Sequence, residues 1–445
     1  MITFNNTLDI AIQSICSWDK KMILSNVTLV RDVYGTVSFA MDNMETVADF
    51  DEQKLKTILT KNMGKYFSGR IYWKKLSGNF KNISRRIKPI IDLIEAERVQ
   101  KEMCDNIMFF VSERPIAKKA WICRTQNIES VWPYEEAVKE NGTKVVTFYS
   151  FKGGMGRTTA LAGVVLTLVK QGKNVVMIDT DIEAPGLATL FFEEEIITKG
   201  VLDYLIEHEI DGGIQVEDYV FDVTDPVLLD EEDGRLFLMP AGKVDDNYLQ
   251  KLARIDYQDN RENHLRDSLT GLLTDIKSRY SPDYIFVDAR AGFHDMGGVA
   301  VTQLPHGVVL FGNDSRQSWD GIAQVLRTIA ERHTEDFPIM IIDTMCPKPI
   351  SSDFAISRKR FLQKSYTVCQ ENYYDAGSKL PGIEAPGEIH FPELIPFDDD
   401  LLRGIELFSD GSQEQNRQVG VYKDKLTGEI YEKVANRIAG WFGEA

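Results

Sequence analysis

The stretch from Ser150 to Thr159, SFKGGMGRTT, decides the fold of most of this chain. It follows KVVTFYS (144–150), which is typical of a buried strand, and precedes TTALAGVVLTLVKQGK (158–173), which is apolar almost all round, as a buried helix is. A glycine-rich turn between a strand and a helix points backbone N–H groups at an anion, and the helix dipole favours that anion. We therefore predict a phosphate-binding loop, with the Thr158 hydroxyl placed to bind Mg²⁺.

The loop departs from the general pattern GxxxxGK[ST] at two positions. Phe151 stands where the first glycine is expected, and Arg157 stands where the lysine is expected. Arginine keeps the positive charge and can hold a phosphate through two parallel hydrogen bonds, although it is bulkier than lysine. A second basic residue, Lys152, precedes the glycines. The loop alone is therefore an incomplete match, and other segments have to support it.

Carboxylates at the ends of two later apolar runs supply that support. Asp179 and Asp181 lie in DTDIEAPG (179–186), and Asp288 lies in DYIFVDARAG (283–292). Because parallel strands direct their carboxyl ends to one edge of a sheet, these side chains are expected to converge where phosphate would bind. One carboxylate can then hold a magnesium-bound water and another can orient an attacking water. The alternative, that these aspartates only form turns, does not explain three signals in this order.

The sequence from about residue 141 predicts an α/β domain. Apolar runs at 306–314 and 337–345 flank an amphipathic helical pattern at 316–333. Strands that alternate with helices indicate a mostly parallel sheet covered by helices on both faces, as in P-loop NTPases. Residues 190–280, with acidic runs and a strand pattern at 235–242, are expected to form an insertion within residues 141–445.

Residues 1–140 predict a smaller α+β domain of a different texture. The segment 22–43 indicates two strands joined by a turn, and the segments 51–67 and 85–103 indicate helices. Between residues 54 and 124 the chain carries 17 Lys/Arg against 6 Asp/Glu, a local charge of +11 in a chain of net charge −17. This basic stretch is a solvated face, a docking surface for the acidic remainder, or a nucleic-acid contact. The sequence does not favour the nucleic-acid contact, and the acidic remainder of the chain disfavours a DNA-segregation role.

No apolar run approaches the roughly 20 residues that a membrane span needs, and the N-terminus lacks the features of a signal peptide. We therefore expect a cytoplasmic protein without membrane attachment. The C-terminal segment EIYEKVANRIAGWFGEA (429–445) has a helical apolar face and is expected to pack on the ATPase core. That face comprises Ile430, Val434, Ile438, Trp441 and Phe442.

The segments FKGGMGRTT, DTDIEAPG and FVDARAG together resemble the deviant Walker A ATPases of the MinD/ParA group, in the SIMIBI class. The loop resembles the variant of that family with KGGVGR in place of KGGVGK, and the resemblance covers about residues 144–445. It implies that Lys152 is the signature lysine, which reaches across a dimer interface to the nucleotide of the partner subunit. It also implies nucleotide contacts from Gly153, Gly154, Met155, Gly156, Arg157, Thr158 and Thr159.

The same resemblance implies roles for the carboxylates. Asp181 would be catalytic, positioning the attacking water, while Thr158, Asp179 and Asp288 would lie at the metal. Gly292 would lie near the γ-phosphate. Adenine contacts are expected around Asp343 and Pro396, although the family often has asparagine at the first of these positions.

The resemblance implies ATP and Mg²⁺ as cofactors and an ATP-dependent homodimer. The expected function is a slowly hydrolysing ATPase that acts as a switch, recruiting or regulating a partner protein encoded nearby, as in bacterial conflict or anti-phage systems. The alternative is a nucleotide-sensing scaffold without useful turnover, because Arg157 replaces the usual lysine.

Overall fold

A computed structural model describes residues 2–42, 49–73, 94–95, 98–114, 117–122, 142–210, 213–255, 264–333, 337–374, 379–402 and 404–444. The chain divides into two compact units. The first comprises Met1–Lys119 with Cys123–Asn127, and the second comprises Ala120–Ile122 with Ile128–Ala445. The sequence places the boundary at residue 140, and the short segment Ala120–Ile122 is the notable difference between the two divisions.

The first unit is an α+β fold built on a five-stranded sheet in the order β3-β2-β1-β5-β4. Pairing is antiparallel between β1 and β2 and between β4 and β5, and parallel between β1 and β5 and between β2 and β3. Its elements are α1 (Thr7–Cys16), β1 (Asn26–Arg31), β2 (Val37–Met41), α2 (Asp49–Met63), β3 (Phe67–Trp73), β4 (Val99–Cys104) and β5 (Ile107–Glu113).

Local chemistry explains the β1–β2 turn that the sequence predicts. The Asp32 carboxylate accepts hydrogen bonds from the backbone N–H of Tyr34 and Thr36 and from the Thr36 hydroxyl. Gly35 has a φ of +83°, which glycine adopts without a steric penalty. This aspartate-glycine arrangement reverses the chain between the two strands.

The helix expected over residues 85–103 is wrong in its last part. Val99–Cys104 forms strand β4, which pairs with β5. Most of the earlier part, including residues 85–93, lies outside the described residues. Pairing along β5 overrides the local helical pattern at the end of this segment, because a ladder of backbone hydrogen bonds outweighs a weak propensity.

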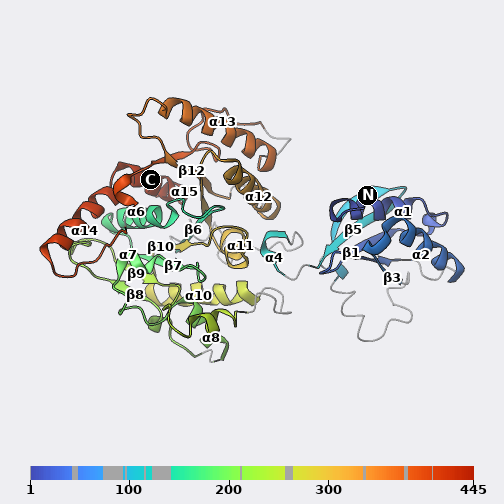
Figure 1. The fold of residues 1–445 in the computed structure, drawn as a ribbon, viewed down its shortest axis with the longest axis horizontal. Coiled ribbons are helices and arrows are strands. Elements are labelled where there is room, and N and C mark those ends of the chain that lie inside the picture. The colour runs from blue at the N-terminus through green and yellow to red at the C-terminus, as the bar shows by residue number, and fades with distance from the viewer. Residues whose placement is uncertain are drawn as a thin grey trace. The chain divides into compact units, whose positions relative to one another are not determined.

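The second unit contains an eight-stranded sheet in the order β13-β12-β11-β6-β10-β7-β9-β8 (Figure 1). Every neighbouring pair is parallel except β8–β9. The strands are β6 (Lys144–Ser150), β7 (Val175–Asp179), β8 (Phe221–Val223), β9 (Leu236–Met239), β10 (Tyr284–Asp288), β11 (Gly307–Gly312), β12 (Ile339–Cys346) and β13 (Glu393–Pro396).

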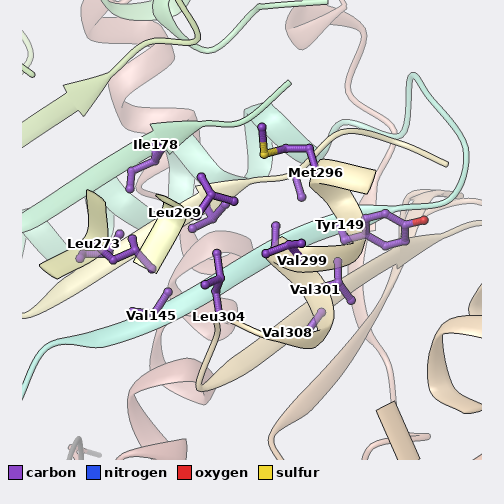
Figure 2. Close-up of a cluster of buried hydrophobic side chains, with 14 of the residues drawn as sticks. Val145, Tyr149, Ile178, Leu269, Leu273, Met296, Val299, Val301, Leu304 and Val308 are labelled. Atoms are coloured by element: carbon purple, nitrogen blue, oxygen red, sulfur yellow. The ribbon is translucent and has the colours of Figure 1, made fainter. Parts of the chain in front are cut away.

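Helices cover both faces of this sheet, as the sequence predicts. Two hydrophobic clusters lie on its opposite faces. One includes buried residues of α6 (Arg157–Lys170), α14 (Gln413–Leu426) and α15 (Glu429–Trp441). The other includes α8 (Val201–Ile210), α10 (His264–Tyr280), α11 (Asp295–Thr302), α12 (Arg316–Arg332) and α13 (Phe354–Asn372). Figure 2 shows part of this second cluster, where apolar side chains of α10 and α11 meet the strands.

The region from 190 to 280 extends the same sheet. The expected strand within 235–242 is β9, which pairs in parallel with β7, and β8 adds an antiparallel edge. The short helices α7 (Ala188–Phe191) and α9 (Tyr248–Leu252) precede the longer helices α8 and α10, respectively, along the chain.

The C-terminal helix α15 packs on α6, which confirms the expectation of core packing. Val434, Ile438 and Phe442 are buried, although Ile430 is 41% exposed. Gly163 of α6 permits the close approach, because a Cβ there would lie 2.6 Å from the Tyr431 ring. Within the described part of the chain, we find no helix with the length and apolar character needed to cross a membrane.

Candidate functional site

The glycine loop lies between the carboxyl end of β6 and the first turn of α6. Gly154 and Gly156 have φ values of +72° and +67°, which side-chain-bearing residues rarely adopt. Gly156 is the residue before the helix and offers no side chain to cap it. The backbone N–H groups of the first turn of α6 are therefore left for an anion, and Gly153 and Gly154 are exposed beside them.

A hydrogen bond fixes the loop to a neighbouring strand. The Thr344 hydroxyl of β12 donates to the Met155 carbonyl over 2.8 Å. The Met155 side chain is buried in the cluster around α6. Any contact of Met155 with a nucleotide would thus come from its backbone. The hydrogen bond from Thr344 and the buried Met155 side chain fix the position of the loop.

Arg157 and Thr158 converge on Asp288. The Arg157 guanidinium forms an ion pair with one oxygen of Asp288, and the Thr158 hydroxyl donates to the other over 2.7 Å. A further Arg157 nitrogen lies 3.8 Å from Asp181. Burial alone would lower the pKa of Arg157, but Asp288, Asp181 and Asp179 raise it. The arginine is therefore charged and serves as the counter-ion of the carboxylate end of the sheet.

Asp179 organises the loop that follows β7. One oxygen of its carboxylate accepts from the backbone N–H of Asp181, and the other accepts from those of Gly186 and Leu187. Burial and the neighbouring Asp288 raise the pKa of Asp179 to about 7, against the opposing effect of these N–H donors. The carboxylate fixes the course of residues 180–187, of which Asp181 lies 3.8 Å from Arg157.

The loop after β7 and the loop after β10 are joined by ion pairs. We call the group Asp181, Glu183, Arg290 and His294 the interloop cluster. Arg290 pairs with Glu183 over 2.6 Å and lies 3.8 Å from Asp181, while His294 pairs with the other oxygen of Glu183. Burial raises the pKa of Asp181, whereas the adjacent Arg157 and Arg290 lower it. The two loops therefore meet beside the Asp181 carboxylate, whose pKa is shifted in opposite directions by burial and by the two arginines.

Lys152 and Thr159 lie on either side of the phosphate-binding turn. Lys152 is partly exposed and, among the described residues, forms no hydrogen bond or ion pair. Thr159 is partly exposed in the first turn of α6. Both side chains are thus partly accessible at the turn, and no described residue pairs with the lysine.

Asp343 and Pro396 lie near the carboxyl ends of two adjacent strands. β12 and β13 are parallel neighbours, with Cys346 opposite Pro396. Asp343 is only 3% exposed, and its Oδ2 atom has no hydrogen-bond partner among the described residues. Burial, together with Asp314, raises the pKa of Asp343 to about 7. The expected adenine contacts therefore lie on neighbouring strands, with one carboxyl that is costly to ionise.

The oxygen donors at Thr158 and Asp288 fit a magnesium ion that arrives with a nucleotide. Mg²⁺ is usually held by one or two protein oxygens together with phosphate oxygens and waters. The hydroxyl and the carboxylate already touch, and both are hard oxygen donors. No cluster of three or more metal-ligating side chains occurs in the described ranges, so a complete protein cage is not formed there.

Sequence reasoning missed two members of the interloop cluster. Glu183 lies two residues after Asp181, and Arg290 lies two residues after Asp288. The available signal was an acidic residue four positions beyond the end of β7 and a basic residue two positions beyond the end of β10. His294, a lone histidine in the loop after β10, completes the cluster.

Residues 143–340 match a family model described as an AAA domain. An uncharacterised ATP-binding protein of Methanocaldococcus jannaschii is 27% identical over 150 residues, which are 34% of this chain and 46% of that protein. An uncharacterised protein of Borreliella burgdorferi is 33% identical over 64 residues, which are 14% of this chain and 26% of that protein. The chain thus spans about half the length of the first of these curated relatives and about a quarter of the length of the second.

Among solved structures, the septum site-determining protein MinD of Pyrococcus horikoshii, in complex with Mg-ADP, is similar to 66% of this chain. The match covers 96% of that protein at 16% identity, with a TM-score of 0.41. The family-model match spans β6, the glycine loop and the carboxylate strand ends, and it stops at the start of β12. Residues 143–340 are thus similar in sequence to the AAA domains that this family model describes.

Proposed function

We propose that this protein binds ATP with Mg²⁺ and hydrolyses it slowly, with the bound nucleotide setting the conformation of the two loops beyond β7 and β10. The observation that carries this proposal is the convergence of Arg157 and Thr158 on Asp288 at the uncapped start of α6. An anion site and a metal-ligand pair thus lie side by side, as phosphoryl transfer requires.

The residues of the chain would divide the work as follows. The glycine loop and the first turn of α6 bind the phosphates, and Thr158 and Asp288 hold the metal. Mg²⁺ would supply positive charge that stabilises the phosphate oxygens. Arg157 moves part of its pairing from Asp288 to phosphate, because both anions compete for one guanidinium. This exchange of partners links nucleotide binding to the carboxylate end of the sheet.

Asp181 would orient the attacking water. It lies at the start of the loop organised by Asp179 and within 3.8 Å of atoms of both Arg157 and Arg290. A change in the partner of Arg157 therefore alters the charge balance at Asp181. Slow hydrolysis suits a switch, because the lifetime of the nucleotide then sets the lifetime of the conformation.

Phosphate release by the purified full chain tests the ATPase. Thr158→Val removes the hydroxyl that faces Asp288 and should lower Mg²⁺-dependent turnover by at least about tenfold. Thr167→Val is the matched control, because Thr167 lies in the same helix and its hydroxyl bonds only the Gly163 carbonyl. The enzyme proposal is wrong if no condition gives turnover above that of Asp181→Ala.

The ion pair between Arg157 and Asp288 also supports the second candidate, a nucleotide-sensing scaffold. In this case the arginine retains Asp288 and limits the metal, so that ATP binds without useful turnover. Equilibrium binding of ATP and ADP separates the two candidates. Tight binding together with turnover no faster than that of Asp181→Ala identifies the scaffold, whereas absence of binding rejects both.

We further propose that ATP assembles a homodimer in which Lys152 reaches the nucleotide of the partner subunit. Its accessible side chain, without an ion pair among the described residues, supports this role. Light scattering with ATP, with ADP and without nucleotide should show a dimer in ATP alone. Lys152→Ala should remain monomeric in ATP, while Lys170→Ala, at the far end of α6, should dimerise normally.

A switch of this kind needs a partner protein. We propose one encoded beside it, as in conflict or anti-phage systems, on the strength of the motif resemblance. Co-expression with the products of neighbouring genes, followed by purification in ATP and in ADP, tests this. An association that depends on ATP supports the proposal, and association unaffected by the nucleotide contradicts it.

A further inference from the structure

The short helix α4 (Lys119–Ile122) contains residues that belong to the ATPase unit although the neighbouring chain belongs to the first unit. Ala120–Ile122 is part of the second unit, while the chain up to Lys119 and from Cys123 to Asn127 is part of the first. Trp121 is 5% exposed and Ala120 is also 5% exposed, and both lie in the hydrophobic cluster on the α10–α12 face of the sheet. The connecting chain is thus anchored in the ATPase core at this tryptophan.

Trp121 contacts the loop that follows Asp288. Its indole N–H donates to the His294 carbonyl over 2.8 Å, and its ring packs against Phe293 at a centroid distance of 5.2 Å. The His294 carbonyl also accepts the Gly298 N–H over 2.8 Å, which is the first hydrogen bond at the start of α11. The indole therefore holds the point at which the loop becomes a helix.

The anchor is built on two helices. The Thr302 hydroxyl of α11 donates to the Ala120 carbonyl over 3.2 Å, and the Thr328 hydroxyl of α12 lies 3.4 Å from the Trp121 carbonyl. Gly298 makes the approach possible, because a Cβ there would lie 2.8 Å from the indole nitrogen. A side chain at that position would displace the tryptophan or the helix.

A row of aromatic rings connects this anchor to the glycine loop. Phe293 packs on Phe151 at 4.8 Å, and Phe151 follows the last residue of β6. Trp121 also packs on Tyr149 at 5.7 Å, and the Tyr149 hydroxyl donates to the Gly292 carbonyl over 3.0 Å. Figure 2 shows Tyr149 at the margin of the core, with its hydroxyl directed away from the other labelled side chains.

We infer that Trp121 is a positioning residue for the loop 289–294, and that the connecting chain regulates the nucleotide site through it. This inference rests on the proposed function, in which the bound nucleotide sets the conformation of that loop. A pull on the chain beside Trp121, or a change in its order, weakens two contacts together. These are the hydrogen bond to the His294 carbonyl and the packing on the Phe293 ring. The first unit thereby has a covalent route to the ATPase that needs no interface of its own.

Hydrogen exchange of the full-length protein, with ATP turnover and ADP affinity, tests the inference. Trp121→Phe keeps an aromatic ring but removes the N–H donor, and should speed amide exchange within 289–298 by about threefold to tenfold. Trp121→Ala should speed it by more than about tenfold. Turnover should fall in the same order, by up to about tenfold, while affinity for ADP stays within a factor of about two.

Gly298→Ala should disrupt the contact between Trp121 and the start of α11 by a change on the helix instead of the tryptophan. Alanine favours the helix, so faster exchange at the loop cannot come from a weaker α11. In a Trp121→Ala background the added methyl no longer meets the indole and retains only its contact with the Ala120 Cβ, 2.9 Å away, so the two changes should be non-additive. Trp441→Phe, on α15 beside Gly307, is the control for loss of a tryptophan and should leave exchange at 289–298 unchanged.

The outcomes separate this inference from the proposed function. If the wild type turns over no ATP, the ATPase proposal fails, and the exchange data still decide the role of Trp121. If the wild type is active but Trp121→Ala exchanges at 289–298 as the wild type does, the inference alone is wrong. The same holds if Trp441→Phe speeds exchange there as much as Trp121→Phe does.

Discussion

The two ends of the large sheet use the same strands for opposite electrostatic purposes. At the amino end, β6 and β10 begin with Lys144 and Tyr284, and both side chains contact the Glu444 carboxylate. At the carboxyl end, β10 finishes at Asp288, which shares Arg157 with two further aspartates. One end surrounds a single carboxylate with donors, and the other gathers carboxylates around a single buried arginine.

The amino end is electrostatically satisfied. Glu444 accepts from Lys144, from Lys173 over 2.8 Å and from the Tyr284 hydroxyl over 2.9 Å. Burial by itself would raise the pKa of Glu444. The three donors lower it by more than burial raises it, so the pKa lies below its ordinary value. The cluster ties the last described residue to the start of the central strands.

The carboxyl end is short of positive charge. The pKa values of both Asp179 and Asp181 are raised, chiefly by burial, even though Arg157 is adjacent. Such a site gains from a further cation, whereas the amino end does not. The comparison teaches that the pairing of Glu444 is structural, while the excess of carboxylates beside Asp288 supports the proposed binding of metal and nucleotide.

The largest expected effect comes from removing the arginine. Arg157→Ala leaves Asp288, Asp181 and Asp179 without their shared cation, and it removes a charge that would bind phosphate. ATP turnover should fall by about a hundredfold or more. Steady-state phosphate release and ATP titration measure the loss.

Lys173→Ala provides the matched change at the amino end. Glu444 retains Lys144 and Tyr284 there, so turnover should stay within a factor of about two. Equal losses in the two variants would show that the two ends do not differ in purpose. Arg157→Lys refines the result, since recovery of activity would show that charge rather than the forked geometry is required.

The next effect concerns stability at the amino end. Glu444→Gln removes the carboxylate that pairs with the ammonium of Lys144, a residue only 1% exposed, and should lower the free energy of unfolding by about 2–3 kcal/mol. Because folding lowers the pKa of Glu444, the ionised carboxylate stabilises the fold fully above about pH 4.5. This stabilisation is lost as the pH falls through the lowered pKa. Urea unfolding at pH 7 and at pH 4 should show a smaller difference between variant and wild type at pH 4.

Asp343 should show the opposite pH dependence. Its pKa is raised to about 7, so ionisation destabilises the fold as the pH rises from about 4 through 7. Asp343→Asn should therefore stabilise the nucleotide-free protein by about 1–2 kcal/mol at pH 8 and by little at pH 4. Asp320→Asn, at an exposed position of α12, should show neither change, and an unchanged pH slope in Asp343→Asn would contradict the prediction.

Much of the ATPase core follows from local sequence pattern. Apolar runs with polar ends predict β6, β7, β10, β11 and β12, because a parallel sheet covered on both faces requires continuous apolar strands. The contact between Thr158 and Asp288 follows from the same pattern. Thr158 lies in the first turn of the helix after the glycine loop, and Asp288 is the last residue of β10. Short-range signals are therefore sufficient where the fold is regular.

The remainder depends on contacts between distant segments. Trp121 lies in the basic stretch, and its role depends on Gly298 and His294, more than 170 residues further along the chain. Strand β4 has a helical-looking sequence whose conformation is set by pairing with β5. No periodicity within either segment contains that information, because the partner supplies the decisive hydrogen bonds.

The smallest expected effect lies in the interloop cluster, at the margin of the carboxyl end. Glu183→Gln weakens its pairing with Arg290 and His294, but the Glu183 side chain is 33% exposed and solvent screens the interaction. Turnover should change by about twofold to threefold, with the loops 180–187 and 289–294 exchanging amide hydrogens faster together. Glu193→Gln, at an exposed position beyond α7, is the control. If Glu183→Gln loosens only one of the two loops, the cluster does not couple them, and the site end holds its two loops independently.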